Sequence, residues 1–196
     1  AQRRQVLVSE LQHRTRNLIA VIQALAAATE REAGSVADFQ HRFRNRMSAL
    51  ARVQGMLSRL DDGQRVTFDS LLESELTAHG MAQERVTLSG PRGVTLKSRT
   101  LQTLALALHE LATNAIKHGA FTSDVGRLAV HWELEPDGTR LRVDWRDTGV
   151  VTSRQTERGS GYGRELIERA LPYQMGARTT YAIEPDGVHC TIALSL

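Results

Sequence analysis

The chain has 196 residues, 41% of them hydrophobic, which suits one ordinary domain or two small ones with a real core. Its single cysteine, Cys190, excludes a disulfide framework and a thiolate metal cluster, and we expect it to be a buried thiol. The formal net charge is +3, with +6 in residues 1–60 and −3 in the rest, but no aromatic platform or nucleic-acid motif accompanies the basic residues, so we expect no nucleic-acid partner.

The chain shows neither a signal peptide nor an apolar run as long as a membrane span. We therefore expect a cytoplasmic protein with no membrane contact from this segment. Because the sequence begins without Met and inside a helical pattern, we also expect it to be part of a longer protein, with a sensor domain upstream.

Residues 1–62 are predicted to form a helical hairpin. Apolar residues recur at helical spacing from Gln2 to Glu30, and again after a cap at Ser35 or Asp38 as far as Leu57. A lone hairpin exposes apolar surface, so it should pair with a second copy as a homodimer or pack on the neighbouring domain. Asp61–Gln64 marks the boundary to a second domain, residues 63–196.

The second domain is predicted to be an α+β sandwich, because helices and antiparallel strands alternate in mixed order. Turn sequences separate the strands, as in Pro136-Asp137-Gly138 and Pro185-Asp186-Gly187. The expected helices are 69–78, 101–118 and 165–171, and the expected strands are 85–89, 127–135, 140–147, 178–184 and 188–196.

The helix over 101–118 has two faces. Leucines, alanines and Ile116 form an apolar stripe, while Glu110, Asn114, Lys117 and His118 follow one another at spacings of three and four. The Asn114 oxygen suits Mg²⁺, and the Lys117 ammonium can neutralise phosphate. The Glu110 carboxylate can accept a proton, so this face is a candidate catalytic surface.

Two further segments add to a nucleotide site. Asp147 ends a strand, and its carboxylate can accept a hydrogen bond from the adenine amine, while Gly149 allows close approach of the base. Gly159, Gly161 and Gly163 open a helix, and their backbone amides can face phosphates. Each signal is weak alone, and the literal string His131-Trp132-Glu133 is read as structural.

Together with Glu10-Leu11-Gln12-His13-Arg14-Thr15-Arg16-Asn17, these blocks resemble, in this order, a bacterial sensor histidine kinase. The chain is most similar to the HWE/HisKA_2 group of the GHKL ATPase superfamily, over nearly its whole length. The resemblance implies a Bergerat-type ATP-binding domain, ATP and Mg²⁺ as cofactors, and His13 as the phospho-acceptor. It also implies a response-regulator receiver domain as the partner that accepts the phosphoryl group.

The match has departures. The acid after Trp145 is Asp147 rather than the Glu of the group, His118 stands where the group has Tyr, and His109 agrees with it. Two alternatives stay open: a histidine phosphotransfer module with a decayed ATP domain, and a GHKL kinase that phosphorylates a separate protein.

Overall fold

The computed structural model describes residues 2–58, 65–81, 83–149 and 161–196, without the side chains of residues 2–11, 13, 14 and 99. The chain divides into two compact units, residues 1–48 and 49–196, and each is considered by itself. Helix α2 (Val36–Ser58) contributes to both units. The domain boundary predicted between residues 62 and 63 falls outside the described residues. Among those described, no helix is both long and apolar enough to cross a bilayer.

The first unit is the predicted helical hairpin, formed by α1 (Gln2–Glu32) and the first half of α2. Of the two predicted caps, Ser35 precedes the helix, and its Oγ accepts a hydrogen bond from the Asp38 backbone N–H at 3.1 Å. Inside the hairpin, the buried Arg46 guanidinium donates to Thr29 Oγ1 at 2.8 Å and to Glu32 at 2.7 Å. These bonds join the two helices near their turn.

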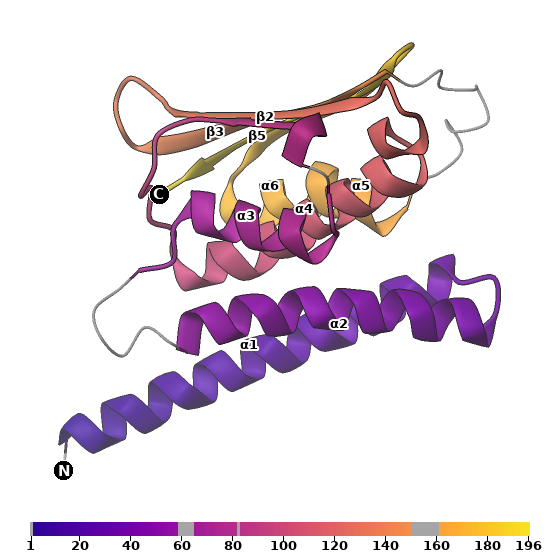
Figure 1. Ribbon diagram of the computed structural model, residues 1–196. Helices are drawn as coiled ribbons and strands as arrows, with labels where there is room; N and C mark the ends of the chain where they lie inside the picture. Colours follow the sequence, from indigo (N-terminus) through magenta and orange to yellow (C-terminus); the bar gives the residue numbers. More distant parts are fainter. Residues whose placement is uncertain (1, 59–64, 82, 150–160) are drawn as a thin grey trace. The chain divides into compact units, whose positions relative to one another are not determined.

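The second unit is a two-layer α+β sandwich, as predicted. Its sheet has the strand order β1-β2-β3-β5-β4, in which only β1 and β2 run parallel. Helices α3, α4, α5 and α6 lie on one face of this sheet (Figure 1). The strands are β1 (Val86–Ser89), β2 (Arg127–Leu134), β3 (Arg140–Thr148), β4 (Arg178–Glu184) and β5 (Gly187–Ser195). The helices are α3 (Phe68–Ala78), α4 (Ser98–Lys117), α5 (Tyr162–Glu165) and α6 (Leu171–Met175), with short helices η2 (Gln83–Arg85) and η3 (Ala120–Thr122).

Strand β3 shows how the sequence sets the core. Its residues alternate between the helix-covered face and the outer face, so that Trp145 and Asp147 are both buried. Strand β5 supplies Cys190 to the same core, where burial raises the pKa of its thiol to about 12. The expectation of a buried thiol is confirmed.

Helix α4 is buried on more sides than the single apolar stripe predicted from its sequence. Nearly every side chain from Leu101 to Ala112 is buried, as expected for a helix that is enclosed on several sides. The prediction for Ile116 is wrong: this side chain is 36% exposed. It lies in the last turn beside the exposed Lys117 and His118, so the burial of α4 ends at Ala115.

The predicted helix over 165–171 is longer and irregular. It runs from Tyr162 to Met175 as α5, a five-residue π-helical segment (η5, Leu166–Ala170) and α6. Pro172 explains the break, because it has no N–H to donate to the preceding turn. The first turn of this helix meets Glu110 of α4 at Gly163, and its last turn meets α4 where the Thr103 hydroxyl donates to Gln174 at 3.5 Å.

Candidate functional site

Glu110 and Asn114 lie one turn apart on α4. Glu110 is buried and Asn114 is half-buried, whereas Lys117 and His118 are exposed at the end of the helix. His118 is the C-cap, and its backbone N–H donates to the Asn114 carbonyl at 2.8 Å. The predicted polar stripe therefore runs from the interior of the domain to its surface.

Gly163 brings α5 against Glu110. A methyl group at Gly163 would lie 2.7 Å from the Glu110 Cβ, closer than real Cβ atoms approach. Glycine at this position thus permits the two helices to touch. Gly161 is the N-cap of α5, so the predicted glycines 161 and 163 both lie at a helix N-terminus beside Glu110. Gly159 lies outside the described residues.

Asn114 forms a hydrogen bond with Tyr181 of β4, a residue that no sequence motif marks. Burial raises the Tyr181 pKa, and the Asn114 hydrogen bond lowers it in part. The Arg164 guanidinium lies 5.7 Å from the centre of the Tyr181 ring, and the Asp147 charge also acts on Tyr181. Tyr181 therefore links three of the polar groups.

Asp147 is a carboxylate on the apolar face of the sheet and is only 3% exposed. Burial raises its pKa to about 6, although the backbone N–H of Ala120 donates to its Oδ1 at 2.5 Å. The other oxygen, Oδ2, lies against Gly119, where any Cβ would overlap it. Gly149 follows at φ +86° and passes close to Gly126. Small residues thus surround this carboxylate, which is almost wholly buried.

Arg85 holds the segment 119–126 in place. Its guanidinium donates to the backbone carbonyls of Ala120, Ser123 and Gly126, and it lies 4.8 Å from the centre of the Phe121 ring. Ala120 is the residue whose N–H binds Asp147, so Arg85 supports the carboxylate indirectly. A single arginine after a short helix carries no sequence signal for this role.

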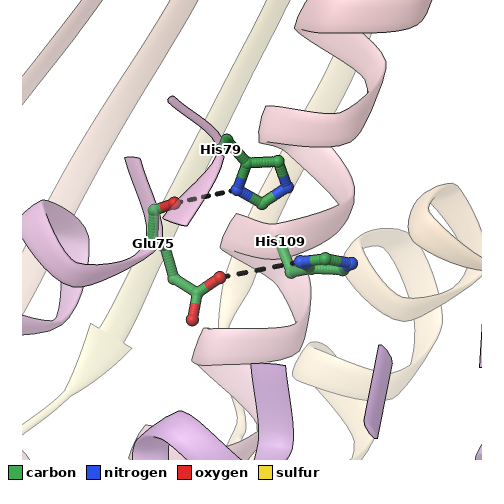
Figure 2. Close-up of side chains that lie close together, drawn as sticks. All are labelled: Glu75, His79 and His109. Atoms are coloured by element: carbon green, nitrogen blue, oxygen red, sulfur yellow. Dashed lines mark hydrogen bonds and ion pairs between the residues drawn. The ribbon is translucent and has the colours of Figure 1, made fainter. Parts of the chain in front are cut away.

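A second polar cluster lies between α3 and α4 (Figure 2). The Glu75 carboxylate is 1% exposed and receives two hydrogen bonds from Arg52 of α2, at 2.7 and 3.1 Å. His109 Nδ1 is 3.6 Å from Glu75 Oε2, and the His79 and His109 rings are 4.8 Å apart. His79, which looks like an ordinary scattered histidine in the sequence, thus belongs to a buried cluster with His109.

His13 lies in α1, in the first unit, and its side chain is outside the described atoms. The neighbouring side chains of Gln12, Thr15, Arg16 and Asn17 are exposed. The remaining described site residues lie in the second unit. The string His131-Trp132-Glu133 is part of β2, where the Trp132 ring nitrogen donates to the Pro91 carbonyl at 2.8 Å, so its structural reading is confirmed.

Comparison with known proteins finds a matching family model and several relatives. Residues 10–92 match the family model described as HWE histidine kinase. A protein named blue-light-activated histidine kinase 1, from Erythrobacter litoralis, is 37% identical over 184 residues, which are 92% of this chain and 49% of that protein. A blue-light-activated histidine kinase from Brucella anthropi is 32% identical over 93% of this chain and 37% of that protein. The chain thus spans half or less of the length of these relatives.

Solved structures show the same fold. The Erythrobacter litoralis EL346 blue-light activated histidine kinase superposes with a TM-score of 0.66 over 96% of this chain and 58% of that one, at 17% identity. The separate histidine kinase domain of that protein gives a TM-score of 0.60 over 92% and 94% of the two chains, at 14% identity. The resemblance seen in the sequence is confirmed: residues 10–92 match the HWE histidine kinase family, and the chain is similar over nearly its whole length to the blue-light-activated histidine kinases.

Proposed function

We propose that this chain takes the γ-phosphoryl group of ATP onto His13 and passes it to an aspartate of a response-regulator receiver domain. The observation that carries the proposal is the arrangement around α4. One domain contains the buried acid Glu110, the half-buried amide Asn114 and the buried carboxylate Asp147, which can accept a hydrogen bond from adenine. The relation to histidine kinases supports the same conclusion.

The ATP site is proposed to lie between the end of β3 and the start of α5. Asp147 would read the adenine amine through Oδ2, since Oδ1 is already occupied by the Ala120 N–H. Guanine presents a carbonyl at the same place, which a carboxylate repels, so the site should select ATP. Gly149 would let the base approach, and His118 would stack on it.

The phosphate end is proposed to lie near Asn114. Its amide oxygen suits Mg²⁺, which prefers oxygen ligands and supplies charge neutralisation at the phosphates when bound. The exposed Lys117 would add a positive charge, and the N-terminal amides of α5 at Gly161 and Gly163 would face the anion.

In the proposed reaction, the unprotonated nitrogen of the His13 imidazole attacks the γ-phosphorus. A phosphorus–nitrogen bond forms, and the bond to the ADP oxygen breaks. The phosphorylated imidazole is then cationic, and the Glu110 carboxylate accepts the proton from its second nitrogen. The protein contributes mainly by positioning and by neutralising charge.

The proposed partners follow from this reaction. The phosphohistidine would serve a receiver domain, an upstream sensor would set the rate, and the helical hairpin would make a homodimer. A cytoplasmic location fits these partners. Shortening the link at residues 61–65 should change self-phosphorylation without weakening ATP binding, and an unchanged turnover would argue against a hinge there.

The test is the chemistry and location of the label from γ-labelled ATP. Phosphohistidine on this chain is acid-labile, whereas an ester on serine of another protein survives acid. Acid-labile label on the chain that moves to a receiver domain supports the proposal. ATP binding without any label on wild type would favour a silenced core or another kind of GHKL protein. Absence of ATP binding would favour a phosphotransfer module.

A further inference from the structure

The cluster of Arg52, Glu75 and His109 joins three helices through one buried charge. Burial raises the pKa of Glu75, but its interactions with His109 and Arg52 together outweigh burial and hold the pKa below the ordinary value. The carboxylate is therefore ionised at neutral pH. A buried charge is stable only while its partners remain, so Glu75 strongly favours positions of α2 and α4 that keep both contacts.

The contact between Glu75 and His109 is slightly too long for a hydrogen bond. The 3.6 Å between Nδ1 and Glu75 Oε2 exceeds hydrogen-bond length, and within the described residues this buried nitrogen has no other hydrogen-bond partner. A displacement of a few tenths of an ångström between α3 and α4 would make or lose this bond. The pair is thus a sensitive point of the domain.

A second tie joins the end of α3 to the same turn of α4. His79 Nδ1 donates to the Glu75 carbonyl at 2.8 Å, so its Nε2 accepts from the Thr113 hydroxyl at 3.2 Å. Thr113 is one helical turn beyond His109 and precedes Asn114. The α3 end therefore contacts both ends of the segment 109–114.

That segment carries the reactive groups on another side of α4. Successive helical residues point about 100° apart, so His109 faces Glu75 while Glu110 faces Gly163 on α5. A movement of the His109 backbone must also move Glu110. Arg52 connects this cluster to α2, the helix that continues from the hairpin. Its side chain is 28% exposed.

We propose that Arg52, Glu75 and His109 form a latch that positions the 109–114 turn of α4, and that α2 sets the rate of phosphoryl transfer through it. The three are positioning residues, since Glu110 and Asn114 are the groups proposed to meet the reactants. The proposal rests on the proposed kinase function for its effect on rate, but the latch itself is a property of the fold.

The test compares Glu75→Gln and Arg52→Gln with Glu135→Gln, which breaks the Arg178–Glu135 ion pair on the sheet. Hydrogen exchange of the amides in 104–118, measured without nucleotide, should become faster in the first two variants and not in the third. In both, the self-phosphorylation rate at saturating ATP should fall about tenfold, equivalent to about 1.4 kcal/mol, while ATP affinity stays within about twofold. The double variant should be no slower than the slower single one.

Exchange in 104–118 equal to that of the control in both variants would overturn the latch. The latch would also be overturned if ATP affinity fell as much as the self-phosphorylation rate, because that outcome indicates a general structural role. Arg52→Gln keeps the test open if Glu75→Gln fails to fold, since its guanidinium is partly exposed. A wild-type chain without label contradicts the kinase proposal alone, and the exchange result still decides the latch.

Discussion

The backbone N–H of Ala120 donates to Oδ1 of Asp147 at 2.5 Å, and this bond ties the end of β3 to the segment that follows α4. It uses one carboxylate oxygen and leaves the other against Gly119, where no side chain intervenes. The bond thereby connects the strand that carries Asp147 with the segment that follows the helix of Asn114.

Replacing Asp147 with Asn should weaken ATP binding by about tenfold to a hundredfold, in line with about 1.4 kcal/mol per factor of ten. Asn keeps a single acceptor oxygen, and the Ala120 N–H already claims it. The amide nitrogen would then face the adenine amine, donor against donor. Titration with ATP measures the affinity, and an affinity equal to wild type would contradict adenine reading by Asp147.

The same variant tests how Asp147 affects stability. Its pKa in the folded protein is about 6, above the ordinary 3.8, so the stability that it contributes is complete below pH 3.8 and is lost as the pH rises through 6. Wild type should therefore lose stability relative to Asp147→Asn between pH 4 and pH 7. Denaturant unfolding of both proteins across this range checks the sign. A wild-type stability that stays constant or rises relative to that of Asp147→Asn between pH 4 and pH 7 would rule out a raised pKa.

Gly119→Ala should destabilise the second unit by about 1–3 kcal/mol, the usual cost of overpacking. The new methyl group would overlap the Asp147 carboxylate and must displace it. Gly34→Ala is the matched control, because nothing lies within 4 Å of a Cβ there. Thermal unfolding distinguishes the two, and equal melting temperatures would mean that the carboxylate has room to move.

Arg85→Met should weaken ATP binding without touching the ligand. Hydrogen bonds to charged groups contribute about 1.5–3 kcal/mol each, and Arg85 makes such bonds to three carbonyls of the segment 119–126. Losing them should loosen Ala120 and reduce affinity by about fivefold or more. The exposed Arg92, replaced in the same way, provides the comparison. Equal ATP affinities in the Arg85 and Arg92 variants would show that the segment 119–126 keeps its conformation without Arg85.

Some of this site could be predicted from the sequence because local periodicity carries it. Helical spacing places Glu110 and Asn114 on successive turns, and strand alternation puts Asp147 in phase with buried Trp145. The cluster around Glu75 could not be predicted, since it depends on how α2, α3 and α4 pack. The same holds for Tyr181, which reaches Asn114 from another element.

The local exceptions have physical causes too. Ile116 continues the apolar spacing of α4, but the residues beyond Ala115 are exposed, so periodicity overstates the stripe. Pro172 interrupts the hydrogen bonds of a helix whose apolar pattern gives no sign of a π-helical segment. Spacing defines a face, and packing decides how far that face is covered.

The most direct test of the central claim is self-phosphorylation with Mg²⁺ and γ-labelled ATP, comparing wild type with His13→Ala and Asn114→Ala. Wild type should carry acid-labile label and neither variant should carry any, with both variants still folded by thermal unfolding. His13→Ala should retain ATP binding, because its residue lies outside the proposed nucleotide site. Label that persists on folded His13→Ala would contradict the assignment of the phospho-acceptor, and with it the proposed function.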